Sequence, residues 1–115
     1  MSAVPSSPAT AWLLAAGALA LVCSIALWAD WRFAEVPRIP MQFGLDGTVN
    51  WTAPRGLGLA FAPALGAIVL ISVLLARGHG GDAQAVVRQV ALTGAVLVAA
   101  ELFHIVLLVR HFAAR

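Results

Sequence analysis

Three long apolar segments alternate with two polar connections along the chain. The apolar segments cover about residues 10–29, 56–76 and 89–109. Each has about the twenty residues that an α-helix needs to cross ~30 Å of hydrocarbon. The connections are a loop over 30–55 and a turn over 77–83. The pattern predicts an all-α fold: a single integral membrane domain over 1–115 that forms a three-helix transmembrane bundle, with a structured interfacial loop between its first two helices.

Residues at the segment boundaries are typical of helix ends. Ser7 is a suitable N-cap with Pro8 at the first helical position, and Asp82 is placed to cap the third helix. Pro63 lies inside the second segment. In lipid we expect it to kink the helix, with a neighbouring group satisfying the carbonyl that it leaves free.

The composition supports lipid as the surrounding solvent. Hydrophobic residues make up 62% of the chain and charged residues 10%, whereas globular chains have about 45–50% and 25%. The basic residues are seven arginines without a lysine, and they form no patch that would indicate a nucleic-acid partner. The tryptophans fall at the expected membrane surfaces, where amphipathic rings prefer to lie: Trp12, Trp28, Trp31 and Trp51.

The distribution of arginine predicts an orientation. The loop and the C-terminal tail, on one side, carry five arginines, and the other side carries Arg77 and Arg88. The positive-inside rule then places the N-terminus outside and the C-terminus in the cytoplasm. The opposite orientation stays open, because the three arginines of the loop are balanced by its acids, Asp30, Glu35 and Asp46.

Two processing events are alternatives for the first segment. A cleaved signal peptide would have a basic start and an apolar core of about 7–15 residues, whereas this segment is longer and starts without a charge. Cys23 would be the lipid-modified residue of a lipoprotein, but Leu21 and Val22 before it lack the small residue of such a site. We therefore expect a retained helix in which Cys23 is a small apolar residue.

Small residues recur at four-residue spacing in all three segments. Such stripes allow helix backbones to approach closely in lipid, within one chain or in a homo-oligomer. They are Ala16, Ala20 and Ser24; Gly58, Ala62 and Gly66; and Ala91, Ala95 and Ala99.

The loop has the signals of a compact structure. Pro37 and Pro40 favour an extended entry, and Asp46-Gly47 is a turn signal. The flanking segments Met41–Phe43 and Thr48–Trp51 are predicted to pair as a short hairpin on the membrane surface. A flexible linker would not need this mixture of proline, glycine and aromatic residues.

The loop resembles a segment of the domain of unknown function at the N-terminus of SdpI-type membrane immunity proteins. The similarity covers about residues 21–70, and the matching positions are Pro37, Ile39, Pro40, Phe43, Gly47 and Trp51. Gln42 replaces a histidine that is frequent in the family, and the family continues into further helices. The resemblance implies a multi-pass protein of the bacterial cytoplasmic membrane and suggests an interaction or an immunity- or stress-related role.

Glu101 and His104 are polar residues inside the third segment, on one helix face. The acid costs about 2.5–3.5 kcal/mol on insertion. The twelve Leu, Ile, Val and Phe residues of 90–109 contribute about −4 to −7 kcal/mol, so insertion remains favourable. Three interpretations stay open: a buried carboxyl–imidazole hydrogen bond that fixes the bundle, a proton or ion relay, and a metal site. A metal site would need carboxylates that the other two segments lack.

The chain shows no catalytic motif. We find no zinc spacing, Walker loop or dinucleotide glycine motif, and Ser24 and Ser72 are isolated hydroxyls expected to bond the preceding helical turn. We therefore predict a non-enzymatic protein without cofactor or metal, whose partners are the bilayer and a membrane protein or peptide. The predicted binding residues are Pro37, Pro40, Gln42, Phe43, Gly47 and Trp51. The alternative is a small ion- or proton-coupled transporter component that uses Glu101 and His104.

Overall fold

The fold consists of three long helices and one β-hairpin. A computed structural model describes residues 8–77 and 82–113. Along the chain the elements are α1 (Pro8–Arg32), β1 (Arg38–Phe43), β2 (Val49–Pro54), α2 (Arg55–Arg77) and α3 (Ala83–Ala113). The predicted N-cap Ser7 and most of the predicted turn over 77–83 lie outside the described residues.

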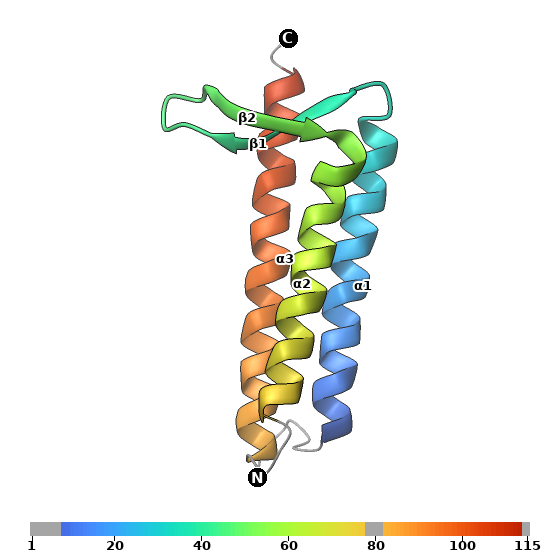
Figure 1. Cartoon of the computed structure of the whole chain (residues 1–115), viewed down its shortest axis with the longest axis vertical. Helices are drawn as coiled ribbons and strands as arrows, with labels where there is room; N and C mark the ends of the chain where they lie inside the picture. Colours follow the sequence, from blue (N-terminus) through green and yellow to red (C-terminus); the bar gives the residue numbers. More distant parts are fainter. Residues whose placement is uncertain (1–7, 78–81, 114–115) are drawn as a thin grey trace.

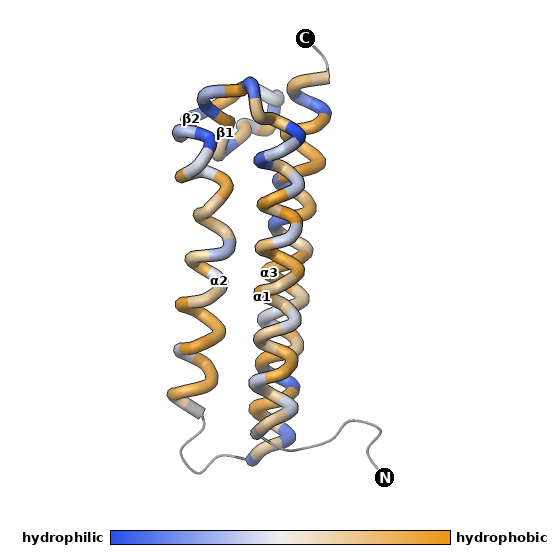
Figure 2. The backbone as a smooth tube through the Cα atoms, turned by 90° about the vertical axis from the view of Figure 1, so that its right-hand side faces the viewer, coloured by the Kyte–Doolittle hydropathy of each residue, from blue (hydrophilic) through white to orange (hydrophobic). Residues whose placement is uncertain are grey.

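The helices form an elongated bundle with the hairpin across one end (Figure 1). α1 and α3 run in the same direction. α2, which lies between them in the sequence, runs in the opposite direction. The hairpin crosses the bundle axis, and the last turns of α3 extend past it. In the side view the traces of α1 and α3 overlap (Figure 2). Each of the three helices contacts the other two.

Each helix is long and apolar enough to span a membrane. The qualifying ranges are Ala9–Arg32, Arg55–Ala76 and Ala83–Ala113. The three predicted segments are confirmed as helices, and each helix extends beyond them. Large apolar side chains cover the outside of the bundle, and Figure 2 shows the corresponding hydrophobic colouring along all three helices. A surface of this kind is the one expected where hydrocarbon replaces water.

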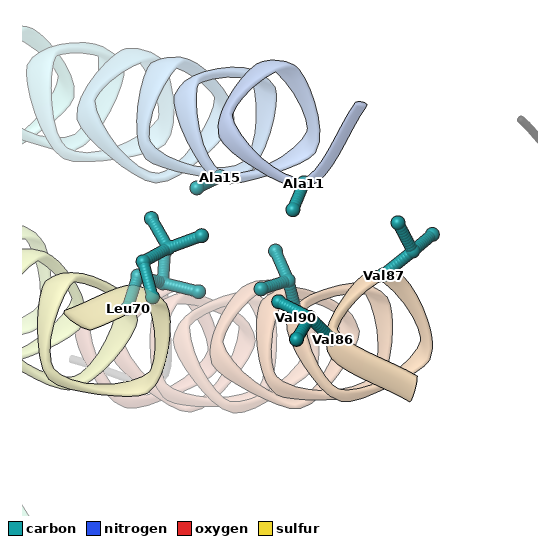
Figure 3. Packing of buried hydrophobic residues seen from close by; sticks show 7 residues of the cluster. Ala11, Ala15, Leu70, Val86, Val87 and Val90 are labelled. Atoms are coloured by element: carbon teal, nitrogen blue, oxygen red, sulfur yellow. The ribbon is translucent and has the colours of Figure 1, made fainter. Parts of the chain in front are cut away.

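The end of the bundle away from the hairpin is held by one apolar cluster. Ala11 and Ala15 of α1 face Leu70 of α2 and the valines of α3 (Figure 3). The members of the cluster are Ala11, Ala15, Leu70, Leu74, Val86, Val87 and Val90.

At the start of α3, the backbone N–H of Gln84 donates to Asp82 Oδ1 at 3.1 Å. The predicted cap at Asp82 is thus confirmed.

In α1 and α3, the small residues that contact a neighbouring helix are not those of the predicted stripes. Ala16, Ala20 and Ser24 are exposed, and the buried residues of α1 include Ala15, Val22 and Ala26. In α3, Ala91, Ala95 and Ala99 are exposed too. The close approach occurs instead at Gly94, where an added Cβ would lie 2.9 Å from the Cβ of Ala18. Four-residue spacing identifies a stripe of small residues but does not say which side of the helix meets a neighbour.

The loop forms a true two-stranded antiparallel sheet, so the all-α prediction was incomplete. The predicted strands Met41–Phe43 and Thr48–Trp51 lie inside β1 and β2, apart from Thr48, which belongs to the turn. Pairing extends to Arg38 opposite Pro54, and the register shifts around Gln42. These shifts leave Met41 without a paired residue on β2, a pattern typical of a β-bulge. Pro54 ends β2 and Arg55 begins α2 directly.

Candidate functional site

β1 packs the inner side of the hairpin against the helices. Ile39 is completely buried and packs in a cluster with Phe33, Leu59 and Leu108. Gly58 of α2 makes this contact possible, because a Cβ at that position would lie 2.7 Å from Ile39 Cδ1 and 2.9 Å from Met41 Sδ. The absence of a side chain at residue 58 therefore sets how closely β1 approaches α2.

A polar contact joins β1 to α3. His104 Nε2 lies 2.9 Å from the carbonyl oxygen of Pro40. Since a carbonyl can only accept, this nitrogen carries the proton. The ring of His111, seven residues after His104 on α3, packs edge-on against Phe43, with ring centroids 5.7 Å apart. Side chains of α3 therefore hold both halves of β1.

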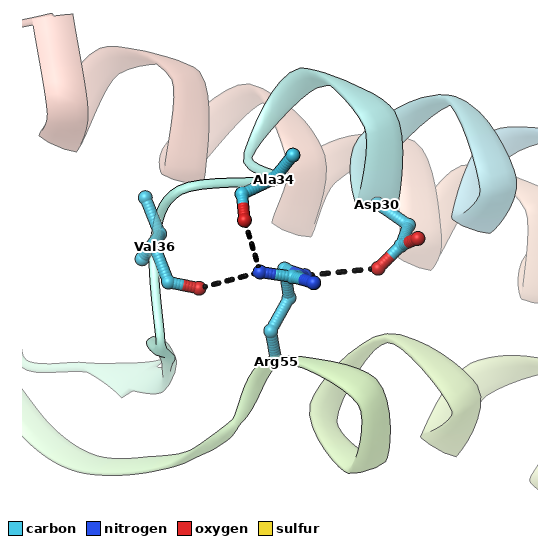
Figure 4. Close-up of polar contacts among 4 residues, drawn as sticks. All are labelled: Asp30, Ala34, Val36 and Arg55. Atoms are coloured by element: carbon cyan, nitrogen blue, oxygen red, sulfur yellow. Dashed lines mark hydrogen bonds and ion pairs between the residues drawn. The ribbon is translucent and has the colours of Figure 1, made fainter.

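Arg55 ties the end of α1 to the start of α2 (Figure 4). Its Nε donates to Asp30 Oδ1 at 2.9 Å, and its Nη1 donates to the carbonyl oxygens of Ala34 and Val36. Its own backbone N–H donates to the carbonyl oxygen of Pro37 at 3.0 Å. These bonds satisfy backbone carbonyls of the segment that joins α1 to β1. The side chain and the backbone N–H of Arg55 together thus fix the segment before β1 against the start of α2.

The turn of the hairpin is closed by the Asp46–Thr48 pair. Asp46 Oδ1 accepts from Thr48 Oγ1 at 2.7 Å and from the Thr48 backbone N–H at 3.1 Å. These two hydrogen bonds lower the pKa of Asp46 below its ordinary value. Gly47 has a φ of +85°, which a residue with a side chain adopts only with strain. The predicted turn at Asp46-Gly47 is confirmed.

Two large apolar side chains are exposed on the hairpin among polar and charged residues that include Arg38 and Asp46. Gln42 and Trp51 are cross-strand partners, and both are exposed. Leu45 projects from the turn with its side chain fully exposed. We call these three residues the outer hairpin surface. Tryptophan is enriched among residues that dominate binding energy at protein interfaces, so this surface is the candidate binding site.

The predicted binding residues therefore divide into two groups. Pro40 is buried and Phe43 is partly buried against the helices. Pro37 is exposed and bonds Arg55 through its carbonyl, and Gly47 shapes the turn. Gln42 and Trp51 are left with exposed side chains. The first group builds the hairpin and fixes it in place, and the second is available to a partner.

Glu101 is buried in the bundle without the partner that its spacing suggested. Its side chain is 4% exposed, and Oε2 makes no hydrogen bond within the described chain. Of the three interpretations, the carboxyl–imidazole hydrogen bond is not formed, and His104 Nε2 bonds the carbonyl oxygen of Pro40. Residues at i and i+3 share a helix face, but each side chain bonds whatever group the tertiary fold brings to it. Glu101 is an orphan polar group, which is rare in folded proteins.

Sequence reasoning missed the roles of Arg55, Gly58 and Leu45. The balance of loop arginines and acids was a signal for Arg55, but only Asp30–Arg55 forms an ion pair among the residues that the structure describes. Arg38 instead donates to Thr52, and Asp46 pairs with Thr48. Gly58 was noted as part of a helix-packing stripe, but it contacts β1.

The other polar groups offer no assembled chemistry. Ser24 Oγ and Ser72 Oγ each donate to the carbonyl four residues earlier at 2.7 Å, as predicted. Within residues 8–77 and 82–113, no group of three or more His, Cys, Asp or Glu side chains is placed to hold a metal ion. The site therefore combines the exposed outer hairpin surface with the buried carboxyl group of Glu101.

Comparisons with models of protein families, with curated proteins and with solved structures give no match to the chain. The resemblance of the loop to SdpI-type proteins therefore stays a prediction.

Proposed function

We propose that this chain is a multi-pass protein of the bacterial cytoplasmic membrane that presents the outer hairpin surface to a protein or peptide partner. One observation carries the proposal: the hairpin is held against α2 and α3, yet it leaves Trp51 and Leu45 exposed. An isolated two-stranded hairpin is marginally stable in water. Its attachment to the bundle keeps these side chains in a fixed geometry, which reduces the entropy lost when a partner binds.

Membrane placement is the first part of this proposal. Three helices of sufficient length and hydropathy support it, as do the exposed rings of Trp28 and Trp31 near the hairpin end and Trp12 near the other end. The arginine distribution favours a cytoplasmic hairpin. Extraction of native membranes with alkaline carbonate tests the placement: the protein should stay in the pellet, and release into the supernatant would contradict it.

The binding role is tested by photo-crosslinking in native membranes from a probe at Gln42, combined with two tryptophan variants. Trp51→Ala should remove the cross-linked partner, because it removes the largest exposed ring of the hairpin. Trp12→Ala is a matched control, because Trp12 is 51% exposed and Trp51 is 52% exposed in the folded chain. A partner that is captured equally from both variants would show that the outer hairpin surface does not bind it.

An immunity role for this surface follows from the resemblance to SdpI-type proteins. In that case the partner is a toxic peptide that binds the outer hairpin surface. Expression of the chain should then protect cells from the peptide, and Trp51→Ala should abolish the protection at unchanged protein level. Equal survival with Trp51→Ala would argue against it.

A second candidate function is that of a proton-coupled transporter component, and the orphan carboxyl of Glu101 favours it. Intramembrane acids commonly mark proton or ion sites. Glu101 is the only acid inside the three apolar segments, so a path across the membrane would need further groups from a second copy or a partner. Proton flux into liposomes tests the candidate, and wild-type flux with Glu101→Gln would remove it.

A further inference from the structure

A groove runs along the face shared by α1 and α3. Two adjoining hollows, of about 880 and 500 Å³, share the side chains of Leu21, Ser24 and Leu102 and so form one groove. On α1 it extends from Leu13 to Trp28, which is about 22 Å at 1.5 Å per residue. One leaflet of hydrocarbon is about 15 Å thick. The groove is therefore long enough for a whole acyl chain.

The groove is lined by groups that suit hydrocarbon. Its lining includes small residues such as Gly17, Ala18 and Gly94, and the close contact of Ala18 with Gly94 keeps the two helices together there. The hydroxyl of Ser24 donates its hydrogen bond to the carbonyl oxygen of Ala20. An occupant therefore meets apolar surface over nearly the whole length.

The hairpin end of the groove differs from the rest because it carries a cation. Arg110 lines the groove together with Trp28 and is exposed. Within the described chain, Arg110 makes no hydrogen bond or ion pair. Asp30, an acid that lies just beyond Trp28 on α1, is already paired with Arg55. An anionic group at the membrane surface would therefore complement a charge that the chain itself leaves open.

We propose that this groove binds an anionic phospholipid from the leaflet on the hairpin side, with its phosphate at Arg110 and one acyl chain between α1 and α3. The proposal rests on the membrane placement proposed above but not on any partner of the hairpin. Basic pockets between transmembrane helices are a known type of site for anionic headgroups. The single cation at one end of an apolar groove favours an anionic lipid, which brings a negative charge and a hydrocarbon chain together. A second copy of the chain could offer Glu35 at this end but not Asp30, because Asp30 is paired with Arg55.

The headgroup contact is tested with spin-labelled lipids and the full chain in phosphatidylcholine vesicles. Labelled phosphatidylglycerol should associate with the protein about fivefold more strongly than labelled phosphatidylcholine, the effect of one arginine near an anionic headgroup. Arg110→Gln should abolish this preference. Arg88→Gln is the matched control near the opposite end of α3, and it should keep the preference. A preference that survives Arg110→Gln, or that Arg88→Gln weakens equally, would overturn the proposal.

The acyl-chain contact is tested with two neighbouring alanines of α3. Ala99 lines the groove, whereas Ala100 is also exposed but is not part of the groove lining. Ala99→Phe should reduce the motionally restricted fraction of the anionic lipid, and Ala100→Phe should leave it unchanged. If Ala99→Phe instead lowers energy transfer between labelled copies of the chain without affecting bound lipid, the groove belongs to a second copy and the proposal fails.

Flotation of the same vesicles separates this proposal from the one that it rests on. A chain that does not float with the vesicles contradicts the membrane placement itself. A chain that floats but shows no lipid preference leaves that placement intact and overturns the lipid site.

Discussion

His104 of α3 bonds the carbonyl oxygen of Pro40 in β1 at 2.9 Å, although 64 residues separate them in sequence. The contact fixes the height of the hairpin on the bundle. Replacing His104 with alanine leaves the buried carbonyl of Pro40 without a donor, which costs about 1–3 kcal/mol. We expect His104→Ala to weaken hydrogen-exchange protection of β1 and β2 while the cluster around Leu70 keeps its protection.

The control for this prediction is His104→Gln, whose side-chain amide is a donor and should retain part of the protection. If His104→Ala leaves the exchange of both strands unchanged, the hydrogen bond does not hold the hairpin.

Gly58 should be intolerant of any side chain. In Gly58→Ala the new Cβ would lie within 3 Å of Ile39 and Met41, so β1 must move away from α2. Displacing a buried side chain in this way costs about 1–3 kcal/mol. Gly56→Ala is the matched control, because a Cβ there meets nothing within 4 Å, and alanine at a helix position is favoured by about 0.5–1 kcal/mol. Unfolding of the two variants in mixed micelles should shift in opposite directions, and equal shifts would contradict the fit.

Arg55 should not be replaceable by lysine. Arg55→Lys keeps the charge near Asp30 but cannot reach the carbonyls of Ala34 and Val36 with the same planar fork. We expect a loss of about 1–2 kcal/mol, as for hydrogen bonds to a charged donor near a surface. Asp30→Asn removes only the partly exposed ion pair and should cost at most about 1 kcal/mol. Losses of equal size would mean that the ion pair, and not the carbonyl bonds, is the main contribution.

Acidification should loosen the hairpin turn. The side-chain hydrogen bond from Thr48, followed by that from its backbone, lowers the pKa of Asp46 below the ordinary 3.8. A carboxyl group whose pKa is lowered by folding stabilises the folded turn above the unfolded pKa, and the effect is lost as pH falls through the lower folded pKa. The amide resonance of Thr48 should therefore shift at a pH below 3.8. Asp46→Asn should remove this titration, whereas Glu35→Gln should preserve it; a shift that persists in Asp46→Asn comes from another group.

Removing the orphan carboxyl should stabilise the isolated bundle. Glu101→Leu replaces a buried polar group that lacks a partner with an apolar one, and the gain is about 1–3 kcal/mol. Glu101→Gln keeps a buried polar group and should change stability less. Unfolding in sodium dodecyl sulfate, followed by helical circular dichroism, measures both. A loss of stability in Glu101→Leu would show that Glu101 has a partner in the bundle, for example from a second copy.

The helices were predictable because apolar length determines them, whereas the site depends on contacts between distant segments. The prolines and Asp46-Gly47 indicated a hairpin, since these residues act locally. The length of the strands and the bulge near Gln42 were not predictable, because no local residue pattern specifies them. The contact of Ile39 with Gly58 was not predictable either, since it joins segments that are distant in sequence. The Glu101–His104 spacing was misleading for the same reason: the sequence shows a shared helix face but not the carbonyl that β1 brings to it.

At one end of the molecule, Ile39 and His104 attach the hairpin to α2 and α3, and Arg55 ties the start of α2 to Asp30 of α1. At the opposite end, α1 is held within the described chain chiefly by the short side chains of Ala11 and Ala15 against α2 and α3. The resistance of the bundle to separation is therefore unequal along its length. Any widening of the helices should begin at the far end and stop at the hairpin, so the outer hairpin surface can keep its shape while the opposite leaflet accommodates movement.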